Sequence, residues 1–167
     1  MLAEAACELF LERGYEETSV TDIAMRAGVG RSSFFNYASS KAELLWGSLD
    51  ERIDLARVTI DSGASAADAV RGIAAGFGPD VLALAIANAD AMMIEGHLER
   101  EASLRLWRIA RLSSRAERRD GADPMAADVR GGAYGAALIA AIWSWASEGA
   151  GTEPLAGHVE RALSAIV

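Results

Sequence analysis

The stretch that decides the fold is residues 18–45, TSVTDIAMRAGVGRSSFFNYASSKAELL. Ser19 can cap a helix while Asp22, three residues later, bonds back to the cap. Gly28 then interrupts the apolar periodicity, and glycine fits the tight turn between two helices that cross steeply. The pattern therefore predicts two short helices joined by a turn, followed directly by a third helix that starts near Ser40.

The second short helix, predicted at residues 31–37, has a polar face that is free to meet something outside the protein. A helix held out from a small core in this way places its side chains in the major groove of DNA. Arginine pairs well with guanine and asparagine with adenine, so Arg31 and Asn36 are the expected base-reading residues. We expect Thr21, Tyr37 and Lys41 to hold phosphates; the alternative for Lys41 is a solvated surface lysine. The full predicted DNA-binding set is Thr21, Gly30, Arg31, Ser32, Ser33, Asn36, Tyr37 and Lys41.

The N-terminal part of the chain resembles the TetR (tetracycline-repressor) family of transcription regulators. The matching residues are 5–15 (AACELFLERGY), 18–20, 22–24, 27–35 (AGVGRSSFF) and the Ser40, Lys41, Glu43, Leu44, Leu45 group. The resemblance covers about the first 47 residues, while the rest agrees with the family in length and helical character. It implies an N-terminal DNA-binding domain and a C-terminal domain for effector binding and dimerisation.

Two positions depart from the family pattern. Phe35 stands where the family usually has tyrosine, which removes a hydroxyl that could contact a phosphate. Ala38 stands where the family usually has phenylalanine, which leaves less packing beneath the recognition helix. The family often has a basic arm before the first helix, and the numbering here starts inside that helix.

Composition restricts the class of protein. Hydrophobic residues make up 51% of the 167 residues, which excludes a disordered chain, and the single cysteine, Cys7, excludes an internal disulfide. We find no leader peptide and no apolar run of the roughly 20 residues that a membrane span needs, so we expect a cytoplasmic protein. The net charge of −8 argues against general nucleic-acid binding, although basic residues outnumber acidic ones within residues 21–47.

Helix signals recur along the whole chain, and strand signals do not. The predicted class is all-α with about nine helices, comprising an N-terminal helix-turn-helix unit of three helices and a C-terminal helical domain for ligand binding and dimerisation. The expected domains are residues 1–47 and 48–167. The expected helices span residues 1–13, 20–27, 31–37, 40–60, 66–77, 79–93, 95–119, 124–148 and 153–166.

The helix expected at residues 124–148 is rich in glycine and alanine, and small residues allow two helices to approach closely. The family resemblance implies a homodimer through this helix and the last one. The expected interface is Leu138, Ile142, Trp143, Leu155, Val159 and Leu163. The alternative is ordinary packing of an alanine-rich helix within one chain. A dimer could read two half-sites of a palindromic operator about 34–36 Å apart.

A cavity for a small, largely apolar effector is expected in the C-terminal domain, because methionine and aromatic side chains adapt to apolar ligands. The candidate lining is Phe77, Met92, Met93, His97, Trp107, Tyr134 and Trp143. Ordinary core packing is the alternative for these residues, and a surface or core histidine is the alternative for His97. A metal pair of His97 with Glu101 lacks a third ligand at helical spacing.

These observations favour a ligand-responsive transcription regulator, a repressor that an effector releases from its operator. An alternative is a helical interaction module on the same scaffold that has lost sequence-specific DNA binding. We find no nucleophile elbow, phosphate-binding loop, metal triad or paired carboxylates at helical spacing. We therefore expect no enzyme activity, no cofactor and no metal, and we expect double-stranded DNA, a small molecule and a second copy of the chain as partners.

Overall fold

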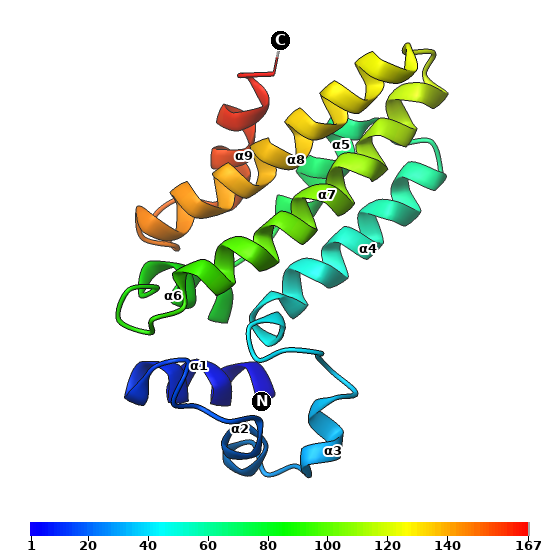
Figure 1. Cartoon of the computed structure of the whole chain (residues 1–167). Helices are drawn as coiled ribbons and strands as arrows, with labels where there is room; N and C mark the ends of the chain where they lie inside the picture. The colour runs from blue at the N-terminus through cyan, green and yellow to red at the C-terminus, as the bar shows by residue number, and fades with distance from the viewer. Residues whose placement is uncertain (167) are drawn as a thin grey trace. The chain divides into compact units, whose positions relative to one another are not determined.

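The computed structural model describes residues 1–166, and every regular element within them is a helix (Figure 1). This confirms the predicted all-α class. The elements are α1 (Leu2–Arg13), α2 (Val20–Arg26), α3 (Arg31–Phe34), the 3₁₀ helix η1 (Glu43–Trp46), α4 (Gly47–Asp61), α5 (Ala66–Ala74), α6 (Val81–Ala87), α7 (Glu95–Arg119), α8 (Pro124–Ser147) and α9 (Leu155–Leu163).

The chain forms two compact units that differ from the expected domains. The first unit contains residues 1–48 and 79–101, and the second contains residues 49–78 and the chain from residue 102 onward. The expected boundary at residue 47 lies next to the first border, but residues 79–101 group with the N-terminal helices. The reason is local packing: α6 lies against α1 and η1, and the Tyr15 amide donates to the Met92 carbonyl at 2.9 Å.

The turn from α1 into α2 follows the sequence prediction. Gly14 ends α1 with φ at 85°, a conformation that glycine adopts without a steric penalty. Ser19 caps α2, because its hydroxyl accepts from the Asp22 amide at 3.1 Å and the Asp22 carboxylate accepts from the Ser19 amide at 3.0 Å. Gly28, with φ at 70°, then supplies the turn before α3.

The segment after α3 differs from the prediction in detail. α3 ends at Phe34, and the chain then forms a tight turn in which the Tyr37 amide donates to the Phe34 carbonyl at 2.9 Å. The expected helix from Ser40 begins as η1 at Glu43. Its cap uses two serines, because the Ser40 hydroxyl accepts from the Glu43 amide at 3.0 Å while the Glu43 carboxylate accepts from the Ser39 amide at 2.7 Å.

The helix expected at residues 79–93 is shorter in the structure. Asp80 caps α6 through its carboxylate, which accepts from the amides of Leu82 and Ala83 at 3.0 and 3.2 Å. α6 stops at Ala87, and Met93 has a positive φ of 53°, which a helix does not allow. The chain therefore turns between residues 88 and 94 before α7 begins.

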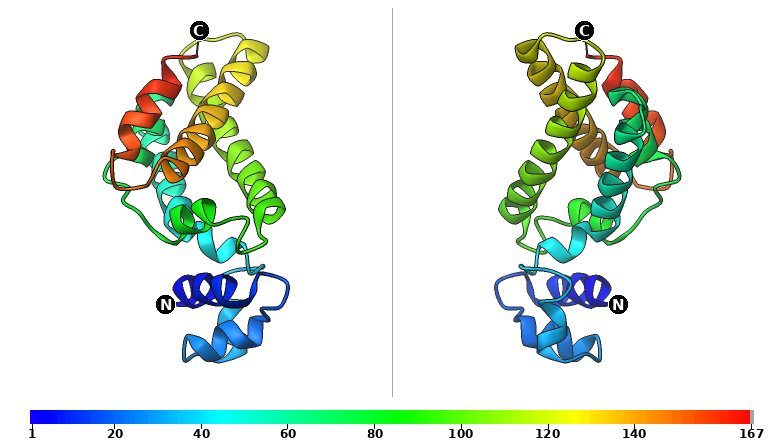
Figure 2. Two further views of the ribbon diagram at one scale, coloured as in Figure 1. Left: turned by 90° about the vertical axis from the view of Figure 1, so that its left-hand side faces the viewer. Right: turned by 90° about the vertical axis from the view of Figure 1, so that its right-hand side faces the viewer.

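In the second unit, α7 and α8 run side by side in opposite directions (Figures 1 and 2). Two glycines of α8, Gly131 and Gly135, allow this close approach. A Cβ atom added to Gly135 would lie 2.6 Å from the Leu106 carbonyl oxygen, and Gly131 faces Ala110 and Ser114 equally tightly. Part of the small-residue pattern of α8 is thus explained by packing inside one chain.

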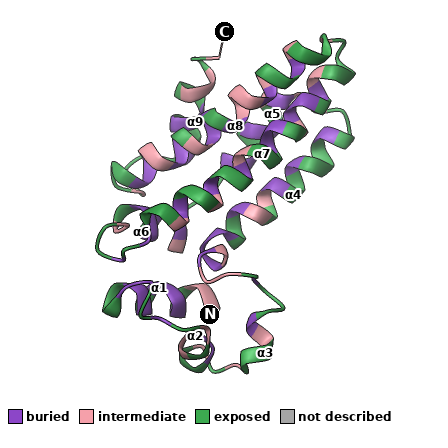
Figure 3. Ribbon diagram, in the orientation of Figure 1, coloured by how far each residue is buried: buried purple, intermediate pink, exposed green. Residues whose placement is uncertain are grey.

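The expected dimer residues are mostly buried within the protomer, and their place in a dimer interface stays a prediction. Figure 3 shows that α8 and α9 both combine buried and exposed residues. Leu138, Ile142, Leu155 and Val159 are buried because α9 packs along α8, so they have no surface to offer a second copy. Trp143 and Leu163 are half-buried.

Candidate nucleic-acid interface

The face of α3 that the sequence predicts to read DNA is exposed. Phe34 is fully buried and anchors α3, and its ring meets the Phe35 ring edge-on at a centroid distance of 5.3 Å. Around this anchor the polar residues point outward. Thr21, Gly30, Arg31, Ser32, Asn36 and Tyr37 are exposed, and Ser33 is half-buried. Lys41 is half-buried as well, so none of the eight predicted residues is fully buried.

Arg31 is distinguished by its lack of partners. Within residues 1–166 its guanidinium makes no ion pair and no side-chain hydrogen bond, and it lies at the start of α3. An unpaired guanidinium keeps all five N–H donors available for a planar acceptor such as a guanine edge or a phosphate. Arg31 is thus the free cation of the α2–α3 segment.

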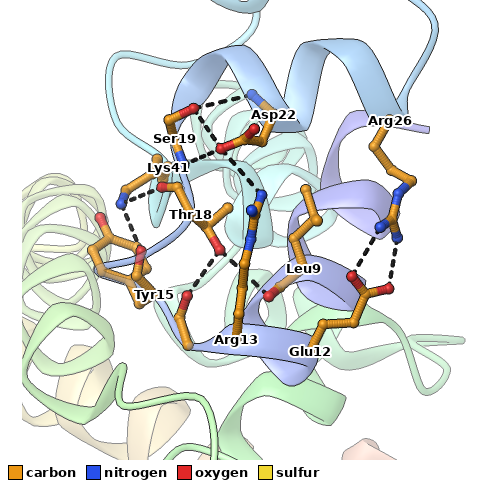
Figure 4. A network of polar contacts seen from close by, with 10 residues as sticks. Leu9, Glu12, Arg13, Tyr15, Thr18, Ser19, Asp22, Arg26 and Lys41 are labelled. Atoms are coloured by element: carbon orange, nitrogen blue, oxygen red, sulfur yellow. Dashed lines mark hydrogen bonds and ion pairs between the residues drawn. The ribbon is translucent and has the colours of Figure 1, made fainter.

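The neighbouring arginines, Arg13 at the end of α1 and Arg26 at the end of α2, are paired with acids (Figure 4). Arg26 pairs with Glu12 at 2.8 Å and with Glu8 at 3.2 Å, both on α1. Arg13 pairs with Asp22 at 3.0 Å. The local excess of basic residues counted in the sequence therefore overstates the positive field available to DNA, because Arg26 is already engaged.

Lys41 makes contacts within the protein that the sequence did not predict, and its contact with a phosphate stays a prediction. Its ammonium donates to the carbonyls of Tyr15 and Thr18, at 2.7 Å each, and lies 4.0 Å from the centroid of the Tyr15 ring (Figure 4). Burial lowers the pKa of Lys41 from its usual value. The side chain ties the loop before α2 to the segment after α3, so its structural role is to hold the helix-turn-helix together.

Tyr15 connects this loop to the start of α7. Its ring lies between Phe10, at a centroid distance of 5.0 Å, and His97, at 4.0 Å. The His97 Nε2 atom is 3.2 Å from a carboxylate oxygen of Glu16. His97 was expected to line an effector cavity, but its contacts here lie with the α1–α2 loop. Tyr15 lies in the stretch 5–15 that resembles the TetR family, and the sequence gives no other signal for this contact.

Thr18 is a further residue that the sequence analysis missed. It is fully buried, and its hydroxyl donates to the Gly14 carbonyl at 2.8 Å, with the Leu9 carbonyl at 3.4 Å (Figure 4). This bond closes the loop between α1 and α2 from inside. A threonine just before a serine cap gives little signal of burial, because both residue types are common at helix starts.

The seven candidate lining residues have different surroundings. Met92, Met93 and His97 belong to the first unit, and the other four belong to the second. Met92 is buried, whereas Met93 and Trp107 are 60% and 68% exposed and so do not line a closed cavity. Phe77 is a core residue, packed edge-on against Trp145 at 5.7 Å.

Tyr134 borders a hollow of about 240 Å³ on the second unit, beside Arg71, Glu160 and Leu163. Trp143, which is half-buried, lies on α8. The assignment of these residues to an effector pocket stays a prediction.

Two further observations concern other chemistry. Burial raises the pKa of the Cys7 thiol to about 11, so this cysteine stays protonated and is a poor nucleophile near neutral pH. Within residues 1–166, no group of three or more His, Cys, Asp or Glu side chains is arranged to hold a metal ion. In the same described part of the chain, no helix is long and apolar enough to cross a membrane.

Comparisons with known proteins agree with the N-terminal geometry. A family model described as bacterial regulatory proteins, tetR family, matches residues 2–46. MftR of Mycobacterium tuberculosis, described as a mycofactocin biosynthesis transcriptional regulator, is 41% identical over 46 residues. That match covers 28% of this chain and 23% of the relative, so the chain spans about a quarter of that protein's length.

Solved structures share the fold over 99% of the chain. FadR of Thermus thermophilus, a TetR-family transcriptional repressor in complex with lauroyl-CoA, is 23% identical with a TM-score of 0.53 over 91% of its chain. FadR of Bacillus halodurans, a fatty acid degradation regulator, is 16% identical with a TM-score of 0.55 over 95%. FadR of Bacillus subtilis, in complex with stearoyl-CoA, is 16% identical with a TM-score of 0.54 over 96%.

The buried Phe34 anchor, the Gly28 turn and the exposed α3 define an all-α protein with an N-terminal helix-turn-helix. Residues 2–46 match the model of the tetR family of bacterial regulatory proteins, and this is the part of the chain that is similar to MftR.

Proposed function

We propose that this protein is a DNA-binding transcription regulator that responds to a small molecule. The observation that carries the proposal is the exposed, unpaired Arg31 at the start of α3, inside the segment that matches the TetR family model. In this proposal α3 enters the major groove, Arg31 and Asn36 contact base edges, and Thr21 and Tyr37 contact phosphates. Lys41 acts by holding the loop before α2.

A second candidate is a helical interaction module that no longer reads DNA. The pairing of Arg13 and Arg26 with acids, together with the engagement of Lys41, favours it, because Arg31 then supplies most of the positive charge at α3. Phosphate contacts provide most of the affinity for DNA, so this surface would bind non-specific DNA weakly.

The two candidates are separated by a DNA titration. Fluorescence anisotropy is measured with a labelled duplex from the region upstream of the gene and with a scrambled duplex, at several salt concentrations. Preference for the upstream duplex supports the regulator. Equally weak binding of both duplexes, lost at moderate salt, supports the interaction module.

We further propose that the regulator is a homodimer, which would let it read a palindromic operator. The support is an exposed apolar stripe on α8 at helical spacing, in place of the buried residues first expected. Met125 and Val129 are 76% and 69% exposed, and Ala136 and Ala140 are also exposed. A Cβ atom on Gly132, in the same stripe, would meet nothing within 4 Å, so a second α8 could approach closely here.

For the effector we propose a molecule with a large apolar part, which releases the protein from its operator by binding better to one arrangement of the protein than to the other. Two of the structurally similar proteins are in complex with lauroyl-CoA and stearoyl-CoA, which makes long-chain acyl-CoA thioesters the first compounds to test. Their addition to the protein–duplex complex should lower the anisotropy. Unchanged anisotropy with both compounds would exclude this class of effector.

A further inference from the structure

The second unit contains a concentration of arginines that contrasts with the chain's net charge of −8. The part of α7 from residue 102 to residue 119 carries six arginines and a single acid, Glu117. Three of them, Arg108, Arg111 and Arg115, lie about one turn apart and face Arg57 of α4. Together with Asp54 and Leu112 these four arginines line a hollow of about 260 Å³.

The acids of α4 hold some of these arginines in place but do not neutralise all of them. Arg108 pairs with Asp50 at 2.6 Å and with Asp54 at 3.0 Å. Arg115 pairs with Asp61, which leaves Arg57 a longer contact of 3.8 Å to the same carboxylate. Ion pairs on the surface contribute little to stability, so a better anion can displace them.

Arg111 is the arginine of this hollow that has no acidic partner within residues 1–166. Within residues 1–166 its guanidinium has neither an ion-pair partner nor a hydrogen-bond partner, although it lines the hollow and is exposed. Guanidinium groups bind phosphate oxygens in a bidentate manner, and several of them converging from two helices suit a ligand with more than one phosphate. The hollow therefore offers one unpaired guanidinium and several weakly paired ones to an anion.

Trp107 adds an aromatic surface next to this hollow. It lies one helical turn before Arg111, so the two side chains share a face of α7, and its indole is 68% exposed. Leu104, a further turn back, is exposed too. An exposed indole beside phosphate-binding arginines is the combination that proteins use to stack a nucleobase while holding its phosphates.

We propose that this face of α4 and α7 binds a nucleoside polyphosphate group, with the base stacked on Trp107 and the phosphates held by Arg57, Arg111 and Arg115. The inference rests on the proposed function, because it names the chemistry of the effector's charged part. A free adenine nucleotide and coenzyme A both carry such a group, and the test distinguishes them.

The test measures direct binding in the absence of DNA, by calorimetry and by tryptophan fluorescence. The probes are ADP, coenzyme A, inorganic pyrophosphate and adenosine. We expect ADP or coenzyme A to bind saturably and to quench the tryptophan fluorescence. The probe that binds more tightly identifies whether the polyphosphate group comes from a free nucleotide or from coenzyme A. Arg111→Gln should weaken binding of ADP, coenzyme A and pyrophosphate about tenfold or more. Trp107→Leu should weaken binding of ADP and coenzyme A while leaving pyrophosphate unchanged.

Arg161→Gln is the matched control, since it removes an exposed arginine of α9 outside the hollow and should leave all four affinities unchanged. Circular dichroism confirms that each variant is folded. The inference is overturned if neither ADP nor coenzyme A binds saturably, or if Arg111→Gln binds them as the native protein does. Because no DNA is present in the binding assay, loss of operator recognition alone would count against the proposed function and not against this site.

Discussion

At the scale of single residues, Arg31 carries the DNA-binding proposal. We expect Arg31→Ala to weaken binding of the upstream duplex about tenfold or more, because a bidentate arginine–base contact contributes about 1–3 kcal/mol of discrimination. Anisotropy titration measures the change. Arg26→Ala is the informative comparison, because Arg26 is engaged by Glu8 and Glu12 and should matter less for the duplex. Equal affinity of native and Arg31→Ala proteins, both folded, would remove Arg31 from the interface.

Lys41 has two alternative roles, a contact with a DNA phosphate or hydrogen bonds that stabilise the fold. Its ammonium satisfies the carbonyls of Tyr15 and Thr18, so Lys41→Met should leave both without this donor. We expect the free energy of unfolding to fall by about 1–3 kcal/mol, measured by urea denaturation. If denaturation is unchanged while duplex affinity drops, the lysine acts on phosphate as first predicted, and its structural role is refuted.

Glu12 makes the ion pairs of α1 testable through pH. The Arg26 guanidinium, which donates hydrogen bonds to it, holds the pKa of Glu12 below its usual value. A depressed pKa in the folded state means that the contribution to stability is complete above the unfolded-state value near 4 and is lost as the pH falls through the folded-state value. The difference in Tm between native and Glu12→Gln proteins should therefore shrink below about pH 4. A difference that stays constant from pH 7 to pH 3 would contradict this.

At the scale of elements, the close packing of α7 and α8 depends on glycine. A methyl group at Gly135 would collide with the Leu106 carbonyl, and backbone cannot move aside as a flexible side chain can. We expect Gly135→Ala to lower the free energy of unfolding by about 1–3 kcal/mol. Gly72 of α5 has open space around its Cβ position, so Gly72→Ala should raise stability by up to about 1 kcal/mol. In thermal denaturation we expect the Tm of Gly135→Ala to fall and the Tm of Gly72→Ala to rise. Two shifts of the same sign would contradict this.

The elements also show what the sequence could and could not predict. Local chemistry was sufficient for the Ser19 cap, the Gly28 turn and the all-α class, because each depends on residues within one turn of the chain. The length of α6 was predicted wrongly mainly at its C-terminal end, because α6 stops at Ala87 and the chain then turns, with Met93 at a φ of 53°. The packing of α7 and α9 decides which face of α8 is buried. The periodicity of the sequence shows that α8 has more than one apolar side, but it does not show which side is covered.

The same limit applied to the candidate site. Exposure of α3 followed from its polar face, whereas the engagement of Arg26 required knowing that α1 lies beside α2. Trp107 was expected in a cavity because aromatic side chains adapt to apolar ligands, yet it is exposed on α7. The ion pairs of Arg26 and the exposure of Trp107 both depend on residues far away in the sequence. A single sequence does not show which distant residues become neighbours.

At the scale of the whole molecule, the proposed dimer depends on the outer stripe of α8. We expect Val129→Glu to convert the dimer to a monomer, because a carboxylate on each copy would be buried without a partner in an apolar two-fold contact. Sedimentation velocity measures the change. Val58→Glu, the same substitution at an exposed valine of α4, is the control and should leave the dimer intact. Loss of the dimer should also weaken binding to a duplex with two half-sites more than to one with a single half-site. A Val129→Glu protein that stays dimeric would place the contact on another face.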